Sequence, residues 1–308
     1  MLRYVLKRVG YMLLTLFVIA TLTFFLMKLL PGSPFNNQDR LSEQQRYMLN
    51  EKYGLNDPVP VQYMNYIVKL AQGDLGITFQ YDGRTVSGMI VDRISPSATL
   101  GMEALIFGTI VGLLLGIAAA LRHNTFVDYG AMVIAVFGIA VPSFVLAGLL
   151  QYFVGVKAQW LPVAFWEGPE THILPALSLS VGVIATIARF MRTEMLEVLG
   201  QDYITTARSK GMSENVVILQ HCIRNSMIPI ITILGPLAVN LITGSLVVER
   251  IFAIPGIGDQ FVKSIMVNDY PTIMGITLFY SALIVVILLV VDILYGLIDP
   301  RIRIAGGK

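Results

Sequence analysis

The chain has little of two things that most soluble proteins have in quantity, charge and cysteine. Only 14% of its 308 residues are charged, against about a quarter in an ordinary globular domain, while 55% are hydrophobic and the mean hydropathy is +0.71. The shortage of charge is concentrated in long uncharged runs rather than spread evenly. This composition excludes a soluble globular domain and predicts an integral membrane protein.

Cysteine and histidine are too few and too scattered to predict a metal site. Cys222 is the only cysteine, which excludes a disulfide within the chain, and His123, His172 and His221 have no paired-ligand spacing. The net charge of +2, without a tract rich in lysine and arginine, argues against nucleic acid as a partner. We expect this chain to bind no metal and no cofactor.

Six apolar runs are long enough to cross a membrane, because about 20 apolar residues span a hydrocarbon core about 30 Å thick. They extend over residues 9–27, 97–121, 130–156, 173–188, 227–248 and 272–291. The run at 9–27 follows basic residues as a signal peptide would, but it is too long and lacks a small-residue cleavage site. We interpret it as an uncleaved first span. The predicted fold class is all-α, a polytopic membrane protein with six transmembrane helices.

Lysine and arginine are unequally divided between the loops on the two sides of these spans. One side carries twelve, which are Arg3, Lys7, Arg8, Arg122, Arg189, Arg192, Arg208, Lys210, Arg224, Arg301, Arg303 and Lys308. The short loops on the other side hold only Lys157, Arg250 and Lys263. Short basic loops stay in the cytoplasm, so we expect both termini and the insert at 189–226 to be cytoplasmic.

Polarity and turn residues divide the chain further. The predicted parts are a cytoplasmic N-terminus with the first span (1–30), an external subdomain (31–96), a five-helix core (97–298) that carries the insert 189–226, and a cytoplasmic tail (299–308). The external subdomain is rich in Pro, Gly and Asn, and its amphipathic stretches at 42–52 and 61–70 predict short helices.

The insert contains signals for a short separate helix. Gly200 is placed to stop the extended fourth helix in a left-handed conformation. Asp202 is placed to cap a new helix over 203–210, which ends at Gly211, and Ser213 is placed to cap a third.

The short helix has two different faces. Ile204, Ala207 and Gly211 share one face at spacings of three and four, and Arg208 and Lys210 lie on another. Small residues on one face and charges on another suit docking into a groove of a partner. The alternative is a solvated connector between two spans, because capped amphipathic helices are common.

Residues 201–212, Gln-Asp-Tyr-Ile-Thr-Thr-Ala-Arg-Ser-Lys-Gly-Met, and the following stretch 221–229 resemble a known pattern. They are similar to the cytoplasmic signature of ATP-binding-cassette importer permeases, in the form used by the dipeptide and oligopeptide branch. The general signature begins Glu-Ala-Ala and reaches Gly four residues after the second Ala. Here Thr205-Thr206-Ala207 and Gly211 stand in its place, a departure associated with this branch.

The resemblance extends over nearly the whole chain, in order and spacing. Further similar pieces are Pro31-Gly32-Ser33-Pro34, Tyr53-Gly54-Leu55, Gly73-Asp74-Leu75-Gly76, Val141-Pro142-Ser143-Phe144, Ile173-Leu174-Pro175-Ala176, Pro255-Gly256-Ile257-Gly258, Asp269-Tyr270-Pro271 and Asp299-Pro300-Arg301. Within the branch, residues 251–258 and 292–301 look most like the first permease subunit of an oligopeptide system.

The resemblance implies a type I importer permease fold and a transport function without covalent chemistry by this chain. The residues that it implies for coupling to the ATPases are Asp202, Tyr203, Ile204, Ala207, Arg208, Lys210 and Gly211. It also implies a second homologous permease, two cytoplasmic ATPases that bind the ATP, an external peptide-binding protein, a peptide substrate and a bacterial or archaeal plasma membrane. Related permeases carry nickel complexes, glutathione or pheromones, so the ligand stays open.

Two alternatives to transport driven by a partner's ATP are an intramembrane protease and a secondary transporter or channel. Gly256-Ile257-Gly258-Asp259 and Tyr81-Asp82 match the short motifs of intramembrane aspartyl proteases, but neither aspartate lies inside an apolar run. A secondary transporter or channel would need ionisable groups near the membrane midplane, and Glu103 and Asp292 lie near the ends of their spans. The chain has no phosphate-binding loop of its own, so ATP must be bound by a partner.

A few polar and helix-breaking residues are candidates for the translocation path and its gate. Asn240, Thr243 and Ser245 are the candidates for the path, although small polar residues in spans more often pack helices together. Pro142 and Pro175 are candidate kinks near a gate, or prolines merely tolerated in a membrane helix. The candidates for an external gate are Glu249, which we expect to pair with Arg250, and Pro255 and Gly256.

Overall fold

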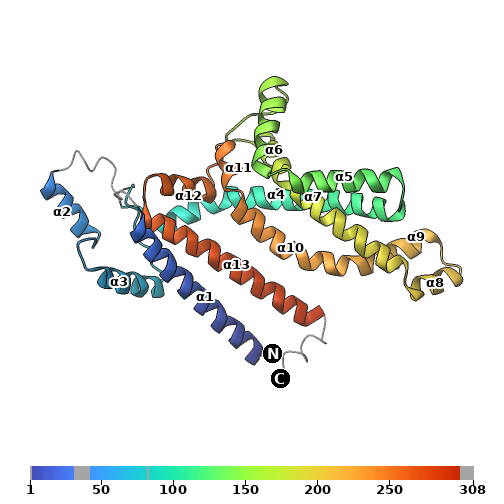
Figure 1. Cartoon of the computed structure of the whole chain (residues 1–308), viewed down its shortest axis with the longest axis horizontal. Helices are drawn as coiled ribbons and strands as arrows, with labels where there is room; N and C mark the ends of the chain where they lie inside the picture. Colours follow the sequence, from blue (N-terminus) through green and yellow to red (C-terminus); the bar gives the residue numbers. More distant parts are fainter. Residues whose placement is uncertain (1, 31–41, 82, 299–308) are drawn as a thin grey trace. The chain divides into compact units, whose positions relative to one another are not determined.

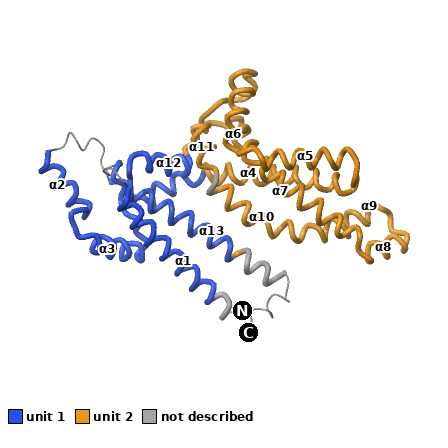
Figure 2. Tube along the Cα trace, in the orientation of Figure 1, with its two compact units in different colours: residues 1–95, 256–289 blue, residues 96–255, 290–308 orange. Residues whose placement is uncertain are grey.

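The computed structural model describes residues 2–30, 42–81 and 83–298 (Figure 1). Three of the sequence motifs, at 31–34, Asp82 and 299–301, together with the predicted tail 299–308, lie outside the described residues. Most of the described chain is helical, and its β-structure is a single antiparallel bridge between Ile77 and Thr85. The chain forms two compact units, residues 1–95 with 256–289 and residues 96–255 with 290–308 (Figure 2).

The first unit combines the N-terminal region with a later segment of the chain. Its helices are α1 (Leu2–Leu29), α2 (Glu43–Lys52), α3 (Val59–Ala71), the start of α4 (Val86–Leu121), α12 (Ile257–Met266) and most of α13 (Tyr270–Ile298). Helices α2 and α3 lie where the amphipathic stretches predict them. Ser42 begins α2 with a capping box, because its hydroxyl accepts from the Gln45 amide and its own amide donates to the Gln45 side chain.

A buried carboxylate joins two distant segments of this unit. Asp269, just before α13, is 1% exposed and accepts hydrogen bonds from the Phe79 amide at 3.0 Å, the Thr272 hydroxyl at 2.7 Å and the Thr78 hydroxyl. A buried carboxylate is tolerated only when such donors surround it. The loop after α3 is therefore fastened to the start of α13.

The second unit is organised around α7 (Pro169–Leu199), which contacts most of its other helices. Besides the rest of α4, the other helices of this unit are α5 (Phe126–Ala140), α6 (Ser143–Leu150), the π-helix η2 (Gln151–Lys157), α8 (Asp202–Ser209), α9 (Glu214–Val216), the π-helix η3 (Val217–Ile223), α10 (Arg224–Gly244) and α11 (Leu246–Ile251). Along α7 the buried side chains include Leu174, Val183, Ile187, Met191 and Met195. This helix forms the centre of the apolar core.

Three glycines of α4 bring this helix into backbone contact with α7. A Cβ added at Gly108 would lie 2.6 Å from Val183 Cβ, closer than real Cβ contacts allow. A Cβ at Gly116 would lie 2.6 Å from the carbonyl oxygen of Ala188, and Gly112 between them has as little room. Small residues every fourth position allow membrane helices to pack this closely.

The span prediction is confirmed with one correction. Five helices are long and apolar enough to cross a membrane, and the number rises to six if the bent pair 126–140 and 143–157 is one span. The run at 130–156 is therefore not a straight helix, because the chain bends by 100° at Val141-Pro142. Pro142 has no amide proton, and it restricts the residue before it to extended conformations. Val141 indeed has φ −90° and ψ 118°.

Candidate coupling and translocation site

Helix α8 occupies the insert, one residue earlier than predicted. Gly211 ends this segment in the left-handed conformation, with φ +77°, as predicted. Two other predictions for this insert are wrong. Gly200 has φ −83° and is not left-handed, and the N-cap residue of α8 is Gln201 and not Asp202. Asp202 lies in the first turn, where its charge still favours the helix dipole. Ser213 is the N-cap residue of α9, without a capping bond from its side chain.

The small-residue face of α8 is directed into this chain and not outward. Ile204 is 0% exposed and Ala207 is 6% exposed, and both belong to the apolar core cluster that contains Met195, Val217 and Cys222. The prediction that Ala207 forms the contact face for a partner is thus contradicted. A small residue is needed there because α8 lies close to its own neighbouring helices, α8 and η3 being in contact.

The opposite face of α8 is open. Asp202, Tyr203, Thr206 and Lys210 are exposed, as is Gly211 after the helix. Tyr203 receives a hydrogen bond on its hydroxyl oxygen from the Asn225 amide group at 3.1 Å, which joins α8 to the start of α10.

Arg208 stabilises the turn between α8 and α9. Its guanidinium donates twice to Glu214, at 2.7 and 3.2 Å. This hydrogen bonding raises the pKa of Arg208 above its ordinary value, so the side chain stays charged at every physiological pH. The pair is about half exposed, and its net contribution to stability is small. Arg208 therefore fixes the turn and is only partly available to a partner.

The carboxylate of Asp128 connects α5 to α7 near the insert. Asp128 is 1% exposed and accepts two hydrogen bonds from Arg192, at 2.5 and 2.8 Å, and one from the Asn124 amide at 3.0 Å. His123 Nδ1 lies 3.1 Å from the same carboxylate. Sequence reasoning missed this cluster, because Asp128 and Arg192 are separated by 64 positions and only the fold brings them together.

A polar cavity lies at the bend between α5 and α6. It has a volume of about 320 Å³ and is lined by residues of α5, α6, α7 and α10, among them Ser143, Ser178, Thr186 and Asn240. Of the residues predicted for a path, Asn240 lines this cavity. The side chain of Thr243 lies outside the described residues. Ser143 and Thr186 were not singled out from the sequence, although Ser143 directly follows the predicted kink at Pro142.

Ser245 belongs to a different cluster, with a residue predicted for the gate. Its hydroxyl donates to Glu249 Oε1 at 2.5 Å, and the Ser97 hydroxyl donates to the same oxygen at 2.8 Å. Glu249 is 0% exposed, so it does not lie at an open mouth of this chain. Two donors to a buried carboxylate, at the step between α10 and α11, indicate a packing role for Ser245.

The other two predicted gate residues lie at the border of the two units. The chain leaves the second unit after Pro255 and re-enters the first unit at Gly256. Pro255 is exposed and Gly256 is buried at the N-cap of α12.

Comparison with known families assigns this geometry to a class. Residues 112–304 match the family described as "Binding-protein-dependent transport system inner membrane component", and residues 1–101 match the N-terminal family of the same membrane components. The chain belongs to this family of multi-pass transport permeases.

Two named relatives show which members of the family it is similar to. The chain is 46% identical to the dipeptide transport system permease protein DppB of Bacillus subtilis over 304 residues, which cover 99% of each chain. It is 40% identical to the oligopeptide transport system permease protein OppB of Salmonella typhimurium, over 98% of this chain and 100% of that protein. It is therefore a permease of the DppB and OppB type.

Solved structures support the fold. The chain is similar to an amino acid ABC transporter solved with histidines, with a TM-score of 0.54 and 16% identity over 68% of this chain and 93% of that one. It is also similar to the MetNI methionine ABC transporter, with a TM-score of 0.53 and 15% identity over 68% and 96% of the two chains. These likenesses show the permease fold, as the sequence resemblance predicts.

Proposed function

We propose that this chain is one of two homologous permease subunits of a peptide importer, whose transport is driven by two cytoplasmic ATPases. The names of the DppB and OppB relatives support a peptide substrate, which an external binding protein delivers. The chain performs no covalent chemistry, and ATP is bound by the ATPases. Both termini and α8 are cytoplasmic in this proposal, as the distribution of lysine and arginine predicts.

The observation that carries the proposal is the combination of a fixed inner face and an open outer face on α8. Ile204 and Ala207 anchor the helix in the core, while Thr206 and Lys210 are exposed. A helix that transmits a displacement has to be held rigidly by its own chain and has to fit the surface of the partner. Closure of the ATPases then favours one state of the permease through its contact with α8.

The same substitution on the two faces separates docking from folding. We expect Thr206→Asp to abolish peptide uptake and loosen the ATPases, with this subunit still stably inserted. Ala207→Asp buries an unpaired charge and should destabilise the subunit itself by about 3 kcal/mol. Arg208→Gln removes a half-exposed ion pair and should change the stability of the subunit little.

The measurements are peptide uptake, ATPase co-purification and the thermal stability of the subunit in detergent. If Thr206→Asp transports normally with its ATPases bound, α8 is only a connector and the coupling proposal is wrong. Co-purification of the whole complex, with identification of the ligand of its binding protein, tests the substrate. If the ligand is a nickel complex or glutathione, the proposed permease role stands and the proposed peptide substrate is wrong.

The polar cavity at the bend is our candidate for part of the path. The side chains of Asn240, Ser143 and Thr186 give it hydrogen-bonding groups that suit the backbone of a passing peptide. We expect Asn240→Leu to lower uptake while ATPase binding stays normal, because no residue of α8 lines the cavity.

A further inference from the structure

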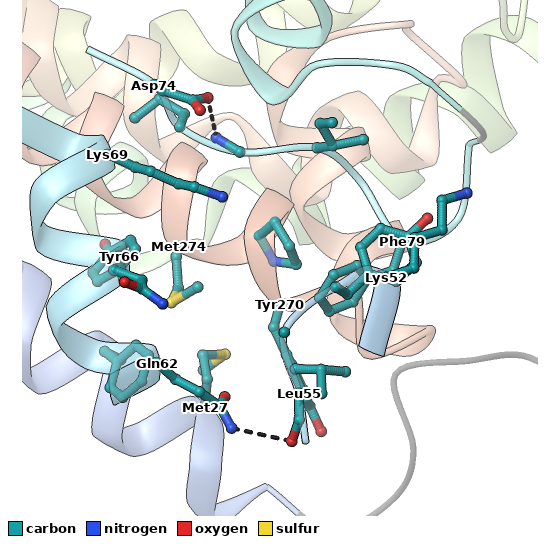
Figure 3. A pocket seen from close by; sticks show the side chains of 18 of the residues that line it. Met27, Lys52, Leu55, Gln62, Tyr66, Lys69, Asp74, Phe79, Tyr270 and Met274 are labelled. Atoms are coloured by element: carbon teal, nitrogen blue, oxygen red, sulfur yellow. Dashed lines mark hydrogen bonds between the residues drawn. The ribbon is translucent and has the colours of Figure 1, made fainter. Parts of the chain in front are cut away.

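The first unit contains a cavity of about 830 Å³ that the coupling and path proposals do not use. It is enclosed by the C-terminal turn of α1, the end of α2, one face of α3, the loop at 74–79 and the start of α13 (Figure 3). Two aromatic groups form its walls. Phe24 stacks on Tyr66 at 5.5 Å between ring centroids, and Phe79 contacts Tyr53 at 4.7 Å.

Several hydrogen-bond donors converge on this cavity from α3 and α1. In Figure 3 Lys69 extends from α3 toward the cavity, while the amide group of Gln62 donates to the carbonyl oxygen of Leu55 at 3.1 Å. The ammonium of Lys69 has no hydrogen-bond or ion-pair partner within the described part of the chain. Lys28 lines the same cavity, donates to Gln62 and lies 5.5 Å from the centroid of the Phe24 ring.

The hydroxyl of Tyr66 is a further donor. It is enclosed, and it has no hydrogen-bond partner among the residues that the structure describes. Burial raises the pKa of Tyr66, so its proton stays in place and can be donated to an oxygen of a ligand. The acidic residues of the lining are Glu51 and Asp74, and Asp74 already accepts from the Gly76 amide at 2.8 Å. The lining has three lysines, Lys28, Lys52 and Lys69, against these two carboxylates.

Helix α3 places the cavity at the depth of a membrane surface. None of its residues is buried, and Val61, Met64 and Val68 form an exposed apolar stripe at helical spacing. Tyr63 touches α1 at both Thr21 and Phe25, so α3 lies along the last third of an apolar span. An amphipathic helix with such a stripe lies in the interface between lipid headgroups and acyl chains.

We propose that this cavity binds the phosphodiester of a phospholipid headgroup through Lys69, Tyr66 and Lys28, with the acyl chains along the exposed apolar faces of α1 and α3. On α1, Leu22, Phe25, Leu26 and Leu29 are exposed at helical spacing, and Met27 of the same helix lines the cavity. Tyrosines and lysines at the end of a span are typical of the headgroup layer. The lipid would fasten α3 to the membrane and support the first unit.

The test measures phospholipid retained by the full-length chain, purified with its co-purifying subunits after reconstitution in phosphatidylglycerol and phosphatidylethanolamine. Native mass spectrometry should find phospholipid bound to the wild type. Lys69→Gln should lower retention about fivefold and Lys28→Gln with Lys69→Gln about twentyfold, the loss expected for lysines at an anionic lipid surface. The matched control is Lys157→Gln, a lysine outside this cavity, which should retain lipid like the wild type.

A photo-crosslinking amino acid in place of Asn65, which lines the cavity, identifies the occupant directly. Captured phospholipid supports the proposal, and captured peptide without lipid overturns it. Equal retention by the wild type and the double variant overturns it as well. Inorganic phosphate distinguishes the two sources of the phosphate group. If it displaces the lipid at millimolar concentration, the cavity is an anion site and the lipid assignment is wrong.

Discussion

Helices α7 and α1 are both long, apolar and able to span a membrane, but the chain surrounds only one of them. In the most apolar stretch of each, 50% of the α7 residues are buried and 17% of the α1 residues. The difference shows that hydrophobicity places a helix in the membrane but does not determine which helix it packs against, because lipid tails and packed side chains are equally apolar. What makes α7 central is the set of small residues on the helices around it.

The largest effect should come from filling the contact between α4 and α7. Gly116→Val introduces a Cβ 2.6 Å from the Ala188 carbonyl oxygen and 2.7 Å from Met191 Cβ, so the helices must separate. We expect a loss of about 3 kcal/mol or more in stability, measured as thermal unfolding of the purified subunit. The control is Gly10→Val on α1, where nothing lies within 4 Å of the added Cβ. Equal effects of the two substitutions would remove the distinction between α7 and α1.

Breaking the buried ion pair that joins α5 to α7 should have the next largest effect. Asp128→Ala leaves Arg192 without its carboxylate, and we expect a cost of about 2 kcal/mol, reduced from the value for a fully buried pair because Arg192 is 23% exposed. Replacing both residues by Leu should cost less than the single change. Thermal stability of the two variants decides this, and a double variant that is less stable than the single one would contradict the expectation.

The smallest effect belongs to α1. Thr21 and Tyr63 share a hydrogen bond of 2.8 Å between α1 and α3, and Tyr63→Phe removes it with little change in packing. We expect a loss of about 1 kcal/mol, detected as faster proteolysis of the segment between α1 and α3 in the purified subunit. A collapse comparable to that of Gly116→Val would show that α1 is as tightly integrated as α7.

Local signals in the sequence predicted much of the fold. The spans follow from length and hydropathy, and the left-handed end after α8 follows from Gly211, because these properties depend on neighbouring residues alone. The proline indicates a bend at Val141-Pro142, but the size of the bend depends on how α6 packs against α7. A periodic pattern cannot supply that information.

The candidate site was predicted only in part, for the same reason. Ala207 is small, and a small residue fits equally well against a partner or against the chain's own core, so the pattern did not decide which face of α8 is open. Asp128 and Arg192 lie 64 positions apart, and no local pattern connects them. Asn240 could be named as a candidate because a polar residue inside an apolar run is visible in the sequence itself, and its part in a path stays a prediction.

The continuity of α7 has a mechanical consequence. Its 31 residues, at about 1.5 Å each, make a rod about 46 Å long that reaches from the stacked rings of Trp166 and His172 to the residue before the α8 turn. Pro175 removes one backbone hydrogen bond near its start, and beyond this residue the glycine contacts with α4 support residues 180–191. In the proposed importer a displacement applied at α8 would travel along this strut as a tilt of the whole rod, and would widen or narrow the polar cavity beside its middle without any change in helix length.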